Sequence, residues 1–336
     1  MKSNYRYIVK AFMAMAVIAG TTSCDDFLDR EPMSSISPET YYSTAAQLEA
    51  NLNDEYPNVL PSFGQWTYGI FGEDKGTDNQ IEVNANDRYT QDRWKVPHSE
   101  SDNWKFERIY RINFFLSEAL PKFGEDMSGS QNTISGSVAT IKHYIGEMYF
   151  LRAYEYFKKL QLFGDFPIIN QPLADEMEAL REASKRFPRN EVARFIISDL
   201  DKAYAYMSDV DMATTRINKD VAMLVKSRVA LFEATWLQNF KGTAFVPGGE
   251  GWPGASLHNN YQYPSGNIDN EVKYFLEQAV EASKLVADKY KGSLTENTGV
   301  LQQSADDPSN PYFDMFAQED LSDVKEVLLW RQYARG

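Results

Sequence analysis

Two stretches of the chain combine aromatic side chains with amide and carboxylate groups, and this combination suits the binding of a sugar. The candidate residues are Trp66, Tyr68, Asp78 and Asn79 in the first stretch and Trp252 in the second. A sugar ring has an apolar C–H face and a rim of hydroxyl groups, so it fits against a flat ring with hydrogen-bonding groups beside it. We therefore predict that these five residues bind a ligand. Each aromatic residue taken alone also fits a role in core packing or in anchoring a loop.

No motif of a common enzyme class occurs in the sequence. The serine nucleophile elbow and the phosphate-binding loop are both missing, and the three histidines, His98, His143 and His258, lie far apart. We expect each histidine to be exposed or satisfied by a hydrogen bond rather than to bind a metal. The sequence therefore predicts no catalytic residue, no metal and no cofactor.

Acidic residues leave two alternatives open. A glycoside hydrolase needs only two carboxylates about 5 to 9.5 Å apart, and with 48 acidic residues the spacing along the chain does not exclude such a pair. Asp306, Asp307 and Asn310 offer oxygen atoms to a cation such as calcium, although they lack the full pattern of a calcium loop. A hydrolase would release reducing ends from a polysaccharide, whereas a binding protein would release none.

The charge and composition also limit the class of protein. The 336 residues include 34 basic and 48 acidic side chains, a formal net charge of -14. We expect no nucleic-acid partner, and a negatively charged polymer is disfavoured, because binding to phosphates draws its affinity from lysine and arginine. With 43% hydrophobic and 24% charged residues, the chain should fold as one large globular domain or as two smaller ones.

The first 24 residues have the pattern of an export signal. Three basic residues precede an apolar run at 11–20 that is too short to span a bilayer. Small residues then lead to Cys24, the single cysteine of the sequence, as at the cleavage site of a bacterial lipoprotein. We predict that residues 1–23 are a signal peptide, that Cys24 carries acyl chains such as palmitate, and that residues 24–36 form a tether. The alternatives are an ordinary signal peptide with an unmodified thiol, and an uncleaved chain with a buried cysteine.

Apolar residues at helical spacing predict that the chain is mainly α-helical. The predicted helices span 37–56, 102–120, 134–163, 190–207, 221–234 and 272–290. Small residues such as Gly146 and Ala153 lie on their apolar faces, so paired helices can approach closely, as in helical hairpins of the tetratricopeptide type. Two short strands are expected at 166–170 and 326–330. The glycine- and proline-rich stretch 240–270 is expected to be an irregular binding loop.

Two adjoining segments rich in aromatic residues lie near the middle of the chain, Leu151 to Phe157 and Leu162 to Ile168. Together they resemble the central signature of the SusD/RagB family of outer-membrane nutrient-binding lipoproteins. Further segments resemble other parts of that family in the same order: 24–32, 104–113, 189–203, 220–232 and 326–330. The resemblance therefore spans essentially the whole chain. Gly164 and Pro167 end a helix and turn the chain, so we expect the signature itself to be structural and to touch no ligand.

The resemblance implies a right-handed superhelix of tetratricopeptide-like helix pairs within residues 24–336, with long irregular loops and minor short strands. It also implies a protein anchored by lipid to the outer membrane, facing the cell exterior. Such a protein captures a glycan, or less often a peptide, for a SusC-like TonB-dependent transporter and is not an enzyme. Family members usually continue beyond the strand matched by 326–330, so we expect the C-terminal part of the family to be missing here. A scaffold that grips only a protein partner remains a further alternative.

Overall fold

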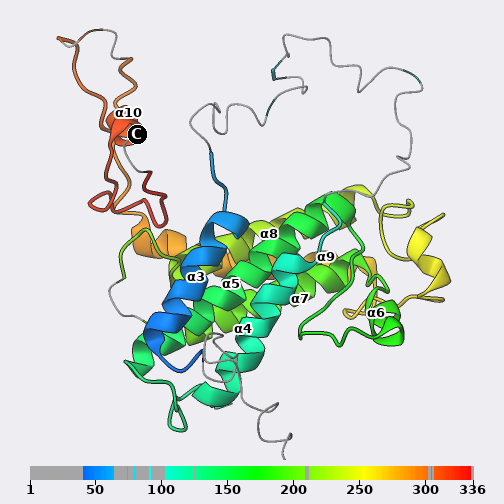
Figure 1. Cartoon of the computed structure of the whole chain (residues 1–336). Helices are drawn as coiled ribbons and strands as arrows, with labels where there is room; N and C mark the ends of the chain where they lie inside the picture. Colours follow the sequence, from blue (N-terminus) through cyan, green and yellow to red (C-terminus); the bar gives the residue numbers. More distant parts are fainter. Residues whose placement is uncertain are drawn as a thin grey trace, which may run out of the picture. The chain divides into compact units, whose positions relative to one another are not determined.

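The computed structural model describes residues 41–63, 74, 79–80, 91, 103–124, 126–208, 212–301, 304 and 306–333. The chain divides into two compact units, Met1–Tyr42 and Ser43–Gly336, and all helices of the described residues belong to the second. These residues form eight α-helices and one short 3-10 helix (Figure 1). They are α3 (Ala45–Val59), α4 (Glu107–Phe123), α5 (Val138–Phe163), α6 (Met177–Ala183), α7 (Arg189–Tyr206), α8 (Lys219–Asn239), η3 (Pro253–Ser256), α9 (Ile268–Tyr290) and α10 (Pro311–Ala317).

The long helices pack side by side around α5. Helix α5 contacts α3, α4, α7 and α8, and α8 in turn packs against α7 and α9 (Figure 1). The prediction of a mainly α-helical chain is therefore confirmed, whereas the handedness of a superhelix stays a prediction. Within the described ranges, every helix is too short or too polar to cross a lipid bilayer.

Small residues allow the close packing that the sequence predicts. Gly146 of α5 lies against the end of α7, and a Cβ atom added to it would stand 2.9 Å from the carbonyl oxygen of Ala203. Ala153 is likewise fully buried. Any larger side chain at Gly146 would push the two helices apart, because real side-chain carbons almost never come this close to a backbone oxygen.

The helix ends differ from the predicted ones where a polar residue begins the helix. Thr44, Ser137, Asn218 and Asn267 each accept a hydrogen bond from a backbone N–H of the first turn, and thereby cap α3, α5, α8 and α9. Asn190, the predicted cap of α7, instead lies inside that helix, where its side-chain amide donates to the carboxylate of Glu271 at 3.1 Å and to the Tyr261 hydroxyl at 2.9 Å. The short helices α6 and α10 are not predicted at all.

The two predicted strands are wrong. At 166–170 only Phe166 pairs with another segment, through a single antiparallel bridge to Phe187. In the stretch 326–330, Glu326 lies in a turn and the other residues have no regular structure. The Trp330 N–H donates to the carbonyl of Thr214 at 3.1 Å, and the Leu328 carbonyl accepts from the side chain of Asn218 at 2.9 Å. Because a β-ladder needs a second extended segment alongside, these isolated bonds form no sheet among the described residues.

Candidate functional site

A pocket of about 580 Å³ lies between α3, α5, α8 and the C-terminal stretch 329–332. We call it the Tyr56 pocket. Its aromatic lining residues are Tyr56, Phe150, Tyr154 and Trp330, and its polar ones are Asn53, Thr215, Arg331 and Gln332. The volume falls within the range of about 300 to 1,000 Å³ that is usual for small-molecule sites.

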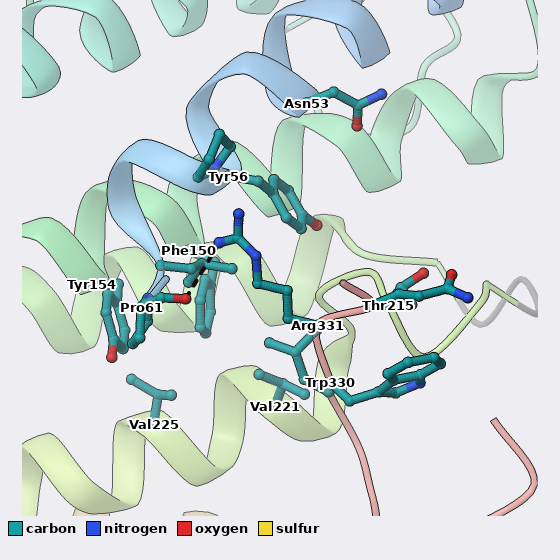
Figure 2. A pocket seen from close by; sticks show the side chains of 14 residues that line it. Asn53, Tyr56, Pro61, Phe150, Tyr154, Thr215, Val221, Val225, Trp330 and Arg331 are labelled. Atoms are coloured by element: carbon teal, nitrogen blue, oxygen red, sulfur yellow. Dashed lines mark hydrogen bonds between the residues drawn. The ribbon is translucent and has the colours of Figure 1, made fainter. Parts of the chain in front are cut away.

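The aromatic rings of α5 form one wall of the Tyr56 pocket. Phe150 and Tyr154 are one helical turn apart, so they lie on the same face of α5, and their rings are nearly parallel with centroids 6.1 Å apart. Phe150 is buried, whereas Tyr154 is half-buried and open to the pocket. Val221 and Val225, also one turn apart, line the pocket from α8 (Figure 2).

The opposite wall comes from the C-terminal stretch. The indole N–H of Trp330 donates to the hydroxyl of Thr214 at 2.9 Å, and the side-chain amide of Asn218 donates to the carbonyl of Leu328, also at 2.9 Å. Arg331 extends across the pocket and donates to the carbonyl of Pro61 at 3.3 Å (Figure 2). These bonds fix the C-terminal stretch against α8 and the end of α3.

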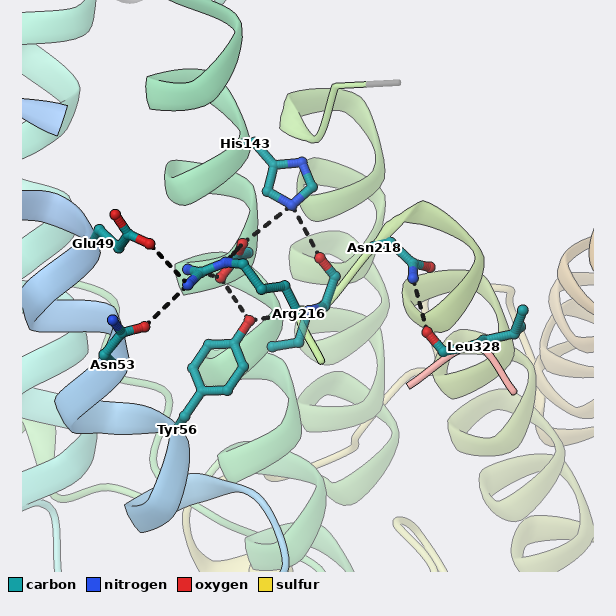
Figure 3. Close-up of polar contacts among 9 residues, drawn as sticks. Glu49, Asn53, Tyr56, His143, Arg216, Asn218 and Leu328 are labelled. Atoms are coloured by element: carbon teal, nitrogen blue, oxygen red, sulfur yellow. Dashed lines mark hydrogen bonds and ion pairs between the residues drawn. The ribbon is translucent and has the colours of Figure 1, made fainter. Parts of the chain in front are cut away.

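A buried polar network holds Tyr56 in place (Figure 3). The Tyr56 hydroxyl donates to a carboxylate oxygen of Glu147 at 2.6 Å and accepts from the backbone N–H of Ile217 at 3.0 Å. Arg216 donates to both oxygens of Glu147, at 3.0 and 2.8 Å, and to the side chain of Asn53 at 3.0 Å. Burial, followed by the charge of Glu147, raises the pKa of Tyr56 well above its ordinary value. The phenol therefore stays protonated and its ring is fixed.

His143 completes this network from one turn before Glu147. Its Nε2 lies 3.1 Å from a carboxylate oxygen of Glu147 and 3.0 Å from the carbonyl oxygen of Ile217. Since both neighbours accept hydrogen bonds, Nε2 carries the hydrogen. Its Nδ1 is buried without a partner among the described residues. The expectation of an exposed or satisfied histidine thus holds for only one ring nitrogen, and the signal in the sequence is the acidic residue four positions later on the same helix.

The sequence-predicted ligand residues lie apart from the Tyr56 pocket or outside the described residues. Trp66, Tyr68, Asp78 and the lipidation candidate Cys24 belong to the ranges outside the description, and Asn79 is described as exposed. Trp252 is only 5% exposed, and its indole N–H donates to Asp165 at 2.7 Å. This position fits the alternative of a loop anchor, although the edge of its ring borders another cavity. Direct ligand contact by these five candidates stays a prediction.

The stretch 240–267 is irregular apart from the single turn of η3, as predicted, whereas residues 268–270 already belong to α9. Its tyrosines hold the loop in place, since the Tyr263 hydroxyl donates to the carbonyl of Pro247 at 2.6 Å and Tyr261 bonds Asn190 of α7. The Tyr261 hydroxyl therefore ties the loop to α7, whereas the Tyr263 hydroxyl joins two parts of the loop. Burial raises the pKa of both tyrosines above the ordinary value, so both remain protonated donors at neutral pH.

The calcium alternative gains nothing from the geometry. The Asn310 side chain caps α10 and donates to Asn297 at 3.0 Å, while Asp307 accepts from the backbone N–H of Ser304 at 2.9 Å. These oxygens are used within the loop itself. In the part of the chain that the structure describes, no three His, Cys, Asp or Glu side chains are placed to hold a metal ion together.

The sequence does not single out the four aromatic residues of the Tyr56 pocket. For two of them the sequence does hold an indication of a surface role, because Phe150 and Tyr154 lie one turn apart and outside the predicted apolar stripe of their helix. Trp330 follows an apolar run that resembles a strand, and Tyr56 ends a predicted helix. Nothing in the sequence shows that these segments meet.

The described residues form a mainly α-helical protein in which a ligand-sized aromatic pocket is built from segments that are distant in the sequence. A SusD-like family model, described as "Starch-binding associating with outer membrane", matches residues 26–231. The match covers well over half of the chain, and the chain belongs to this SusD-like family.

Individual relatives are distant. SusD-like protein P2 of Formosa agariphila is 25% identical over 253 residues, which cover 72% of this chain and 46% of that protein. SusD-like protein P25 of the same organism is 25% identical over 233 residues, 64% of this chain and 41% of that one. A solved SusD-like protein of Bacteroides fragilis is 19% identical, with a TM-score of 0.42, over 63% of this chain and 39% of that chain. A second solved SusD-like protein of Bacteroides fragilis, described as carbohydrate binding, is 18% identical, with a TM-score of 0.41, over 60% of this chain and 40% of that chain. The chain thus spans less than half the length of these relatives.

Proposed function

We propose that this protein binds an oligosaccharide in the Tyr56 pocket and presents it for uptake across the outer membrane. The observation that carries the proposal is a pocket of about 580 Å³ that combines four aromatic side chains with amide, hydroxyl and guanidinium groups. The description of its family names starch binding and the outer membrane, and this supports the same class of ligand.

The lining suggests how a sugar would be held. Tyr154 and Trp330 are half-buried, so their rings can take the apolar face of a sugar, and Trp330 can do so while it keeps its hydrogen bond to Thr214. Asn53, Thr215 and Gln332 offer donors and acceptors for the hydroxyl groups of the sugar. Because the buried network already fixes Tyr56, binding loses little side-chain entropy at that residue.

We further propose that binding occurs without cleavage. The polar groups of the described lining are amide, hydroxyl and guanidinium groups, whereas the acid and base of a glycosidase are carboxyl groups. The purified chain should therefore release no reducing ends from the polysaccharide whose fragments it binds. Accumulation of reducing ends in proportion to the amount of protein would establish the hydrolase alternative instead.

The proposed setting is the outer surface of the outer membrane, with Cys24 as the lipid anchor and a SusC-like TonB-dependent transporter as the partner that receives the glycan. Residues Trp66, Tyr68, Asp78 and Asn79 are proposed as a further surface for the same ligand. A Cys24→Ala variant should no longer incorporate labelled palmitate and should leave the membrane fraction. Membrane retention of this variant would contradict the anchor while leaving the binding proposal intact.

Isothermal titration calorimetry with maltotriose to maltoheptaose tests the Tyr56 pocket. A Tyr154→Ala variant should bind about tenfold more weakly, the value expected for one lost aromatic contact. Tyr110→Ala is the matched control, since Tyr110 is an exposed tyrosine of α4 (50% exposed) outside this pocket, and it should not change the affinity. Equal affinities of the Tyr154 variant and the wild type would refute the pocket. Binding of peptides instead of these sugars would refute the ligand class.

A further inference from the structure

A second cavity, of about 490 Å³, lies where the C-terminal end of α5 meets the N-terminal end of α7 and the loop after α8. We call it the Trp236 pocket. Its aromatic lining comes from Phe163, Trp236, Phe245 and Trp252. Phe245 is 61% exposed, so its ring is available to a ligand, whereas Trp252 is buried and its indole N–H donates to Asp165. The Trp236 pocket and the Tyr56 pocket share no lining residue.

A rigid guanidinium group forms part of the wall of the Trp236 pocket. Arg189 is buried and donates through Nε and Nη2 to the buried carboxylate of Glu233, at 2.9 to 3.1 Å. Its guanidinium carbon lies 4.1 Å from the centroid of the Trp236 ring. The remaining nitrogen, Nη1, donates to no other described group, and a Cβ atom on Gly164, which lines the same pocket, would stand 3.4 Å from it. Arg189 therefore has one preorganised donor left on the pocket side.

A second guanidinium group belongs to Arg186, at the rim. Its side chain is exposed and lies over the ring of Trp104, with its guanidinium carbon 4.6 Å from the ring centroid. Among the described residues no carboxylate forms an ion pair with Arg186. Stacking on the ring of Trp104 holds the guanidinium group in place, and its N–H donors, which lie in the guanidinium plane, stay free to point outward.

The single carboxylate of the lining is already occupied. Asp165 accepts from the backbone N–H of Arg189 at 2.8 Å with one oxygen and from the indole N–H of Trp252 at 2.7 Å with the other. Each oxygen of Asp165 thus already accepts a hydrogen bond within the protein, while the two arginines keep donors on the pocket side. A ligand that fits this arrangement brings a negative charge and a ring.

We propose that the Trp236 pocket is a second binding site, which takes a sugar ring that bears a carboxylate, as in a uronic acid. The ring lies against Trp236 and Phe245, and the carboxylate accepts from Arg186 and from Nη1 of Arg189. The net charge of -14 disfavours a long anionic polymer, but charges beyond about 8 Å are largely screened at physiological salt, so the two arginines dominate at this site. The site recognises a chemical class different from the neutral sugar proposed for the Tyr56 pocket.

Titration of the full chain with trigalacturonic acid and with its methyl ester tests this site, since the two differ in charge and keep the same rings. The acid should bind about fivefold more tightly than the ester, the size expected for a partly exposed charge-assisted hydrogen bond. Arg186→Gln should reduce this preference, because only Arg189 then donates to the carboxylate. Arg181→Gln is the control, because Arg181 is an exposed arginine of the neighbouring helix α6 outside the pocket, and it should leave the preference unchanged.

Two further variants separate the sites. Phe245→Ala should weaken the acid and the ester alike, because it removes the ring surface and no charge, whereas Tyr154→Ala in the other pocket should change neither. Equal affinities for acid and ester in the wild type, or an undiminished preference in Arg186→Gln, would overturn the proposal. A loss of binding in Tyr154→Ala would place the acid in the Tyr56 pocket and would likewise overturn it.

Discussion

Replacing Arg216 with methionine tests whether its ion pair with Glu147 holds Tyr56 in place in the Tyr56 pocket. The Arg216 side chain is 14% exposed and that of Glu147 is 0% exposed. Arg216 contributes two hydrogen bonds to Glu147 and one to Asn53, so the variant leaves a buried carboxylate without its cation. Methionine has a similar length and an apolar side chain, and it therefore removes the charge while filling most of the space.

The expected loss follows from the contacts that remain. Breaking a buried ion pair from one side costs about 3 to 5 kcal/mol. Tyr56 and His143 still donate to Glu147, at 2.6 and 3.1 Å, and offset part of that cost, so we expect the free energy of unfolding to fall by about 2 to 4 kcal/mol. In the double variant Arg216→Met/Glu147→Met no buried charge is left alone. Its loss should therefore be smaller than the sum of the two single losses, by about 2 kcal/mol.

Urea unfolding at 25 °C, followed by the helical circular dichroism signal, measures these differences. A matched control is Lys273→Met, which breaks an exposed pair with Glu277 on α9 and should leave the unfolding midpoint unchanged. If the two single losses simply add up in the double variant, Arg216 and Glu147 are not coupled, and this ion pair does not hold Tyr56 in place. Arg216→Met should also weaken oligosaccharide binding, because Arg216 orients Glu147, the group that accepts the hydrogen bond of the Tyr56 hydroxyl.

Three further changes test other parts of the fold. Arg152→Met leaves the fully buried Asp199 without the two hydrogen bonds that it accepts at 2.6 and 2.8 Å, and urea unfolding should show a loss of about 3 to 5 kcal/mol; an unchanged midpoint would contradict the pairing. Gly164→Ala forces a Cβ onto a backbone with φ of 68°, so calorimetry should show a lower melting temperature, for a cost of about 1 to 3 kcal/mol; an equal or higher value would exclude strain there. Burial raises the pKa of Tyr149 to about 12, and a raised pKa gives stability that is complete below about pH 10 and is lost as the pH rises toward 12. Tyr149→Phe should therefore flatten the decline of unfolding free energy between pH 9 and 11, and an identical slope in both proteins would refute this role.

The long helices could be predicted from the sequence because each has an apolar stripe. Their ends were predicted less well, since α3 and α4 continue past Pro57 and Pro121. Helix α5 ends at Phe163, as predicted, because Gly164 takes a backbone conformation that other residues avoid. The starts were harder to predict. Helices α8 and α9 begin before the first apolar residue of each stripe, since Asn218 and Asn267 cap a first turn made largely of polar residues.

The Tyr56 pocket could not be predicted, because its walls come from segments that are distant in the sequence. Arg216 and Asn53 are 163 positions apart, and Asn218 and Leu328 are 110 apart. Local periodicity carries no information about such contacts. Trp330 illustrates the point, since its apolar neighbours favour a strand while its actual partner is a threonine just before α8.

Ion pairs that join different helices explain how these distant walls keep a fixed relation. The pairs are Arg152 with Asp199 between α5 and α7, Arg189 with Glu233 between α7 and α8, and Arg194 with Glu271 between α7 and α9. Such a pair adds little net stability, because the loss of hydration offsets much of the attraction, whereas a shifted helix would leave two charges buried and alone. We infer that these pairs select the register of the helices more than they add to the stability of the fold. Since both pockets are built on those helices, the choice of register is what brings their aromatic rings together.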